Sequence, residues 1–129
     1  MLMFVLVRPY SLFLILPTRY QMVEWRISIY GRKASEWASL ARWFYVNRLA
    51  HMNVRWLIQI PRLYDIYKRG GEVESFGQML QNIFGPLVAV SLDPNSNPPL
   101  HYFLATIVGF DSVDDESKPD RDNLSNHPR

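Results

Sequence analysis

Cysteine is absent from this sequence of 129 residues, and histidine occurs only three times. Without cysteine the chain can form neither a disulfide nor a thiolate metal site, and this composition fits a cytosolic protein. The histidines, His51, His101 and His127, include no pair that is two or four residues apart. Because a catalytic zinc site needs three or four converging ligands, we predict no metal site in this chain.

A long uninterrupted apolar run is also lacking. The first segment, MLMFVLVRPYSLFLILP, is divided by Arg8 and Pro9 into halves that fall well short of the roughly 20 residues that span a bilayer. It has no basic leading region and no small-residue cleavage site, which argues against a signal peptide. We therefore expect no membrane span. Residues 1–18 are predicted to be an apolar leader, with a buried strand as the alternative.

Neither sign of charge dominates the chain. Lysine and arginine number 14 and aspartate and glutamate 12, giving a net charge of +2. Since no basic cluster is interleaved with aromatic residues, nucleic acid is not an expected partner. The sequence also contains no phosphate-binding loop and no Ser-His-Asp arrangement. Its 48% hydrophobic residues are sufficient for the core of one modest domain or of part of a larger one.

Alternation of apolar and polar residues predicts strands. VEWRISIY places one apolar series on one face and polar residues on the other, and VRWLIQI repeats the pattern before Pro61 ends it. TIVGF predicts a third, mostly apolar strand. The two apolar series are Val23, Trp25, Ile27 and Ile29, then Val54, Trp56, Ile58 and Ile60.

Helical spacing appears between these strands. EWASLARWFYVNRL predicts a helix with Ser35 as its N-cap, and LYDIYKRGG predicts a turn or short helix. SFGQMLQNIF predicts a second amphipathic helix that Pro86 kinks or ends. Pro98 or Pro99 begins a short helix that runs to Leu104. The expected apolar stripe of the second amphipathic helix is Phe76, Met79, Leu80, Ile83 and Phe84.

The order of these elements predicts an α/β fold. Strands joined by helical crossovers should be parallel, with right-handed connections. The polar second face of two strands suits either a barrel with a partly polar lumen or a sheet that holds a site. Three strands cannot close a barrel, and a TIM (β/α)8 barrel takes about 250 residues, so the chain would form an incomplete arc of one.

Four segments in order resemble AMP deaminase: RYQMVEWRISIYGRKASEW, VRWLIQIPRLYDIYK, MLQNIFGPL and VGFDSVDDESKP. The resemblance runs from about residue 18 to about residue 119, and the leader of residues 1–18 does not match the family. It implies a TIM barrel with one catalytic zinc, hydrolysis of AMP to IMP and ammonia, and a homo-oligomer. The three strands would then be the second, third and fourth of the barrel's eight.

The departures from the family pattern are equally informative. Its His-x-His zinc pair, its Lys-Tyr-Asn-Pro stretch, its proton-donating glutamate and its Ser-Thr-Asp-Asp strand are not found in this sequence. We therefore expect a partial chain, inactive alone, with residues 19–117 as a barrel segment and residues 118–129 as a disordered polar tail. The alternative is a non-catalytic product that acts only through protein–protein contacts.

The stretch VGFDSVDDESKP ends a strand in a run of acids. Asp114, Asp115 and Glu116 would face the active-site mouth of a barrel, whereas the residues alone leave open a metal site or a solvated turn. Related deaminases carry Gly-Asp-Glu at this strand end, and here Asp114 replaces the glycine. On the resemblance, Asp114 and Asp115 are candidate substrate-binding residues.

Two arginines also follow strands. Arg32 and Arg62 could hold a phosphate or a carboxylate at the barrel mouth, or pair with the acids. The alternative is an exposed salt bridge, which would contribute little to stability. Ser28 and Gln59 are candidates for the lumen. The four tryptophans are expected to pack in the core rather than to stack on bases.

Overall fold

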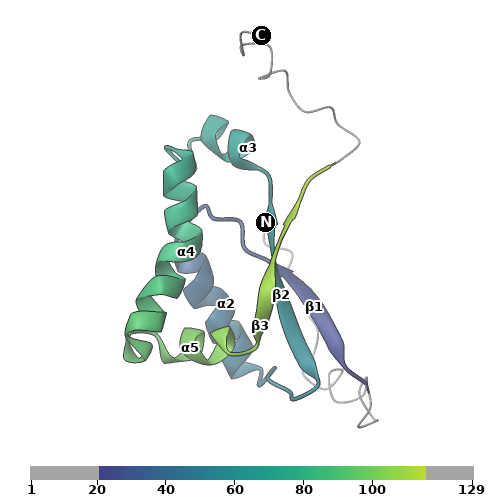
Figure 1. Ribbon diagram of the computed structural model, residues 1–129. Helices are drawn as coiled ribbons and strands as arrows, with labels where there is room; N and C mark the ends of the chain where they lie inside the picture. Colours follow the sequence, from purple (N-terminus) through teal and green to yellow (C-terminus); the bar gives the residue numbers. More distant parts are fainter. Residues whose placement is uncertain (1–20, 116–129) are drawn as a thin grey trace, which may run out of the picture.

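The computed structural model describes residues 21–115, so the predicted leader and polar tail lie outside the described residues. Helices separate the three strands along the chain (Figure 1). Within this range no helix is both long and apolar enough to cross a membrane. The elements are β1 (Val23–Ser28), α2 (Ser35–Val46), β2 (Val54–Pro61), α3 (Tyr64–Arg69), α4 (Phe76–Leu92), the 3-10 helix η1 (Pro94–Ser96), α5 (Pro98–Leu104) and β3 (Ile107–Val113).

The three strands form one parallel sheet in the order β1-β2-β3, which confirms the predicted parallel arrangement. Each connection contains at least one helix, as a parallel crossover requires. Strand β1 pairs with β2 without interruption, whereas the register between β2 and β3 shifts at Trp56 and Leu57. This small α/β sheet is consistent with an arc of a barrel.

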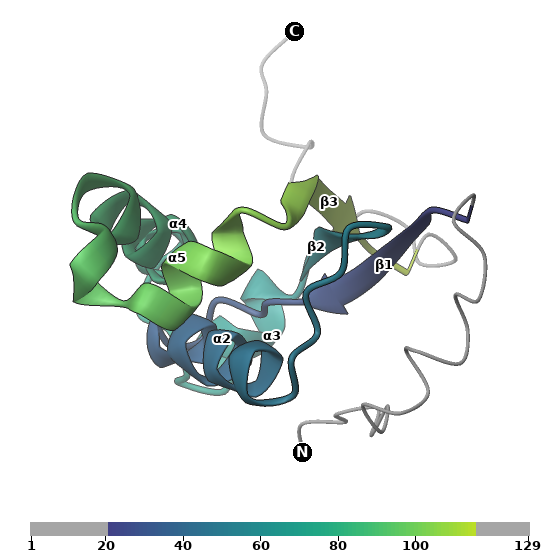
Figure 2. The ribbon, with the colours of Figure 1, turned by 90° about the horizontal axis from the view of Figure 1, so that it is seen from below.

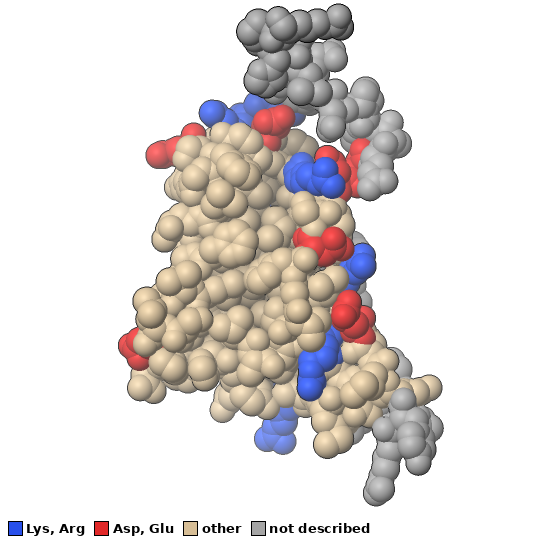
Figure 3. All heavy atoms as spheres, viewed as in Figure 1, with Lys and Arg blue, Asp and Glu red and all other residues tan. Residues whose placement is uncertain are grey.

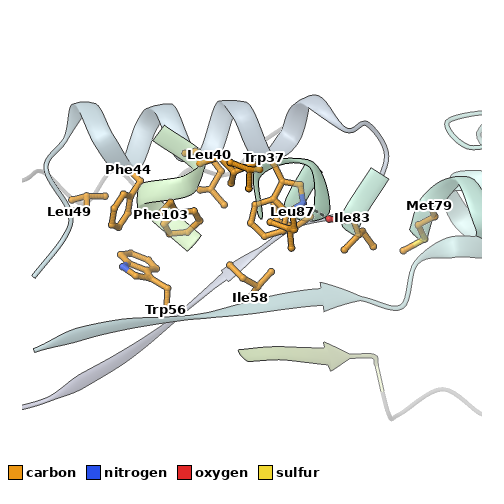
Figure 4. Close-up of a cluster of buried hydrophobic side chains, with 14 of the residues drawn as sticks. Trp37, Leu40, Phe44, Leu49, Trp56, Ile58, Met79, Ile83, Leu87 and Phe103 are labelled. Atoms are coloured by element: carbon orange, nitrogen blue, oxygen red, sulfur yellow. Dashed lines mark hydrogen bonds between the residues drawn. The ribbon is translucent and has the colours of Figure 1, made fainter. Parts of the chain in front are cut away.

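Helices α2, α4 and α5 lie on one side of the sheet (Figure 2). Apolar side chains from both layers form the core between them (Figure 4). The indole N–H of Trp37 on α2 donates to the carbonyl oxygen of Ile83 on α4 at 2.7 Å, so a buried donor is satisfied within this core. The fully buried side chains include Trp37, Phe44, Leu49, Val54, Ile58, Ile83, Val90, Leu100 and Phe103.

The start of α2 differs from the prediction. Ser35 is the first helical residue, and the N-cap is Ala34, whose side chain makes no capping bond. A carboxylate serves instead, since Glu36 accepts hydrogen bonds from four consecutive backbone N–H groups, at 2.8–3.3 Å. A negative charge in the first helical turn is also favoured by the helix dipole. The four donors are those of Tyr30, Gly31, Arg32 and Lys33.

Helix α4 is longer than predicted because it continues through Pro86 to Leu92. A proline inside a helix removes one backbone hydrogen bond and usually bends or ends the helix. Beyond this proline, Leu87 and Val90 are both buried in the core. Tertiary packing of these two side chains therefore outweighs the local preference to stop.

The predicted apolar stripe of α4 was also partly wrong. Met79 and Ile83 are buried, whereas Phe76, Leu80 and Phe84 are exposed. Helix α4 thus carries two apolar stripes. The buried stripe is Met79, Ile83, Leu87 and Val90, and the outer stripe, named so from here on, is Phe76, Leu80, Phe84, Val88 and Leu92.

Candidate functional site

The carboxyl ends of the three parallel strands meet at one end of the sheet. Arg32 lies in the loop after β1, Arg62 directly follows β2, and Asp114 and Asp115 directly follow β3. In α/β proteins with parallel sheets, ligands bind outside these carboxyl ends. The four predicted site residues therefore lie at the end of the sheet where a site is expected.

A polar row crosses the sheet just before these ends. The register pairs Ser28 with Gln59 and Gln59 with Asp111, and paired residues of parallel strands share one face. That face is opposite to the one where Trp25 and Ile27 pack against the core. It is called here the helix-free face, since no helix of residues 21–115 covers it (Figure 2). Ser28 and Gln59 thus point away from the helices, as expected for a lumen.

Arg26 and Asp111 form an ion pair on this face. Nη1 of Arg26 lies 3.3 Å from Oδ2 of Asp111, and the side chains are 58% and 34% exposed. The pair joins the two outer strands across β2. Sequence reasoning missed it, although the alternation of β1 already placed Arg26 on the polar face. The missing signal was the strand register, which decides which residues of β1 and β3 meet.

The guanidinium of Arg32 is held from several sides. Its Nη1 donates to Oε2 of Glu72 at 3.2 Å, and its Nε lies 3.8 Å from Oε1 of Glu36. Its Cζ lies 5.3 Å from the ring centroid of Tyr30 and 5.7 Å from that of Tyr67, within the range of cation–π attraction. Arg32 therefore pairs with these two glutamates rather than with the acids that follow β3.

Tyr67 supports this arrangement as a buried neutral group. Burial raises the pKa of Tyr67 to about 12, and the nearby positive charge of Arg32 acts in the opposite direction. The phenol consequently stays protonated at neutral pH. Its ring remains available to the guanidinium of Arg32.

The loop after β1 is fixed to α4 as well. Gly31 has a φ of 75°, and a Cβ added there would lie 2.8 Å from the side chain of Ile83. Nδ2 of Asn82 donates to the carbonyl oxygen of Gly31 at 2.9 Å. The left-handed backbone and the close approach both require glycine at this position. Together they hold the loop that carries Arg32.

Arg62 lies beside the acids that follow β3. Its backbone N–H donates to the carbonyl oxygen of Val113 at 2.8 Å, which ties the end of β2 to the end of β3. Asp114 and Asp115 are exposed, and Oδ1 of Asp114 accepts a hydrogen bond from the N–H of Asp115 at 2.8 Å. Glu116 lies outside the described residues. The structure thus brings together Arg62, Asp114 and Asp115, while Arg32 belongs to a separate cluster.

A cavity of about 780 Å³ runs along β1 and α2. Arg26, Ser28 and Arg32 line it, together with apolar side chains that include Trp25 and Trp43. Arg62 and the two aspartates after β3 are not among its lining residues. The cavity therefore lies along β1 and α2, apart from the acidic end of β3.

The described residues do not fit a catalytic zinc. Across residues 21–115, no three histidine, cysteine, aspartate or glutamate side chains converge on one point. His51 has its Nδ1 engaged as the acceptor of the Asn53 N–H at 3.1 Å, and His101 lies on α5. No metal-dependent step can be derived from these residues. What they offer is hydrogen bonding and charge.

The model of the AMP deaminase family matches residues 12–129. The chain belongs to this family. The matched range begins within the predicted leader and includes residues 118–129, where a polar tail was expected. The resemblance found in the four sequence segments is thereby confirmed.

Curated relatives agree with this assignment. The chain is 56% identical to the AMP deaminase of Schizosaccharomyces pombe over 110 residues, which is 85% of this chain and 13% of the relative. It is 61% identical to that of Arabidopsis thaliana over 104 residues, 81% of this chain and 12% of the relative. It is 53% identical to that of Saccharomyces cerevisiae over 112 residues, which is 87% of this chain and 14% of the relative. The chain therefore spans a small part of the length of these relatives.

Proposed function

We propose that this chain supplies part of the catalytic barrel of an enzyme that hydrolyses AMP to IMP and ammonia. One observation carries the proposal. This chain belongs to the AMP deaminase family, and its parallel sheet has helices on one face and a polar row on the other. A barrel turns one face of its sheet inward and covers the other with helices. The helix-free face would then line the lumen. Since the relatives reported above are named as deaminases, an enzymatic role is favoured over a purely protein-binding one.

The barrel itself is part of the proposal. The strands follow one another in spatial order, as the strands of a (β/α)8 barrel do. The outer stripe of α4 and the free edges of β1 and β3 would be covered by neighbouring strand–helix units of the complete enzyme. In that enzyme, one catalytic zinc would be held by residues outside 21–115. A cytosolic location and a homo-oligomer remain predictions from the resemblance.

At the barrel mouth, we assign substrate contacts to Arg62, Asp114 and Asp115. The aspartates offer hydrogen-bond acceptors and Arg62 offers a cation, and all three lie at adjoining strand ends. Arg32 is proposed as a further substrate contact, where an anionic group would share its guanidinium with Glu36 and Glu72. Charged groups fixed before the reaction stabilise developing charge most effectively.

A chimera tests this function directly. Residues 18–115 would replace the matching segment of the Schizosaccharomyces pombe enzyme, and ammonia and IMP would be measured with AMP as substrate. We expect turnover within about tenfold of the parent enzyme. This corresponds to a change of at most about 1.4 kcal/mol in the height of the barrier. A chimera that melts like the parent but releases no ammonia would contradict the proposal.

A further inference from the structure

The ion pair between Arg26 and Asp111 has a geometry that a simple link between neighbouring strands would not need. Arg26 pairs in register with Leu57, whereas Asp111 pairs with Gln59, two residues further along β2. The arginine side chain therefore reaches across the middle strand and toward the carboxyl ends. On β3, the residue in register with Arg26 and Leu57 is Gly109, which has no side chain that Arg26 could contact.

The strand register places Asp111 in the polar row just below the mouth. Ser28 and Gln59 occupy the same row, and Arg26 and Ser28 also line the cavity beside β1. Asp111 comes three residues before Asp114 on the same strand. The pair consequently connects the cavity side of the sheet to the acidic strand end.

The contribution of this ion pair to folding stability should be small. Ion pairs with such exposure contribute little, because both charges remain solvated and long side chains lose freedom when they pair. Inside a closed barrel the same pair would be partly shielded from water, and its electrostatic interaction would be stronger. Its value then lies in holding one carboxylate in a fixed place.

We propose that Arg26 is a positioning residue that acts through Asp111. Arg26 holds the Asp111 carboxylate on the lumen side, where it serves as a fixed hydrogen-bond acceptor for an N–H donor in the reaction chamber. This inference rests on the proposed function, because it requires that the helix-free face lines the lumen. Partners that orient metal ligands change activity by about 10–100-fold when they are removed, and we expect a loss of similar size from a partner that orients a carboxylate.

The test uses the chimera described above with three sets of substitutions. Asp111→Asn keeps the shape of the side chain but removes its charge, and Arg26→Gln removes the cation. The double substitution Arg26→Asp with Asp111→Arg restores an ion pair with reversed polarity. The matched control is Arg55→Gln, on the same face but at the amino end of β2, where its guanidinium donates only to backbone carbonyl groups among the contacts identified.

We expect both single variants to lose about 10–100-fold in kcat, with KM changed less and the melting temperature nearly unchanged. The reversed pair should keep the melting temperature of the parent chimera yet fail to recover kcat, because a cation then replaces the carboxylate. The control should turn over AMP normally. If a single variant fails to fold, Arg26→Lys keeps the charge without the planar fork and should give an intermediate loss of kcat.

Two results would overturn the inference alone: single variants with parental kcat in an active chimera, or a reversed pair that recovers kcat. The second result would identify a simple link between strands. An unsubstituted chimera that folds but is inactive would instead overturn the proposed function, and this inference with it.

Discussion

Two surfaces of this molecule face away from its core, and their chemistry is opposite. The outer stripe of α4 is wholly apolar, and the 17-residue helix contains no charged residue (Figure 3). The helix-free face carries Arg26, Ser28, Gln59 and Asp111 in adjoining rows. A helix that is apolar on both sides is normally covered on both sides. The outer stripe is therefore suited to packing, and the helix-free face to binding polar groups.

A ring contact connects the outer stripe to the sheet. The rings of Phe84 on α4 and Phe110 on β3 lie 5.7 Å apart, and both side chains are exposed. Any unit that covers the outer stripe would therefore also reach β3, which is an edge strand. A strand–helix unit that continues the barrel would cover the outer stripe with its helix and pair its strand with β3.

The largest expected effect separates the two stripes of α4. Ile83→Ala should destabilise the folded chain by about 2–5 kcal/mol, because Ile83 is 1% exposed and the substitution leaves a cavity in the core. Its matched partner is Leu80→Ala on the outer stripe, at 39% exposure, which should cost much less. Chemical denaturation of both variants measures the difference. Equal losses would mean that the outer stripe is already packed in the isolated chain.

Next in size is the acidic strand end. In the active chimera, Asp114→Asn or Asp115→Asn should lower kcat/KM by an amount equivalent to about 2.7–4 kcal/mol, because each removes a preorganised charge at the mouth. Thermal melts should change little, since substitutions on the surface usually stay within about 0.5 kcal/mol. Glu74→Gln, an exposed acid before α4, is the control. If both aspartate variants match the parent in turnover, this end is only a solvated turn.

A smaller effect is expected at the loop that carries Arg32. Glu36→Gln should destabilise the fold by about 1–3 kcal/mol, because an amide oxygen cannot replace two charged oxygens that accept four backbone hydrogen bonds. Hydrogen exchange should show faster exchange of the four donors than in the unsubstituted chain. Unchanged exchange would show that other contacts hold the loop.

The smallest effect on stability should come from the outer stripe itself. Replacing Leu80 and Val88 together with glutamine should change the unfolding free energy by about 0.5 kcal/mol or less per site, since both side chains are exposed. Solubility should rise, because a contiguous apolar patch promotes association. Light scattering at increasing concentration compares the variant with the original chain. A large loss of stability would contradict the separation of the two stripes.

Local patterns predicted most of this fold. The alternation in β1 and β2 and the helical spacing after them were sufficient for element order, parallel pairing and the general place of the polar face. The continuation of α4 through Pro86 was not predictable locally, because buried contacts of Leu87 and Val90 maintain it. Glu36 as a loop acceptor was missed for a similar reason, since its partners depend on the folded turn.

For the site, the sequence likewise predicted the positions of residues but not their partners. The positions of Arg32, Arg62, Asp114 and Asp115 after strands followed from the pattern. Their partners did not, because pairing depends on side chains from distant segments, such as Glu72 for Arg32. The pair of Arg26 with Asp111 required the exact offset between three strands, which no short stretch of sequence contains.

If the helix-free face lines the reaction chamber, a structure of the chimera with a bound, unreactive AMP analogue will show it. We expect the nucleotide to lie over the polar row of Ser28, Gln59 and Asp111, at the carboxyl ends of the strands. A nucleotide bound on the helix-covered side, or at the amino ends of the strands, would contradict it.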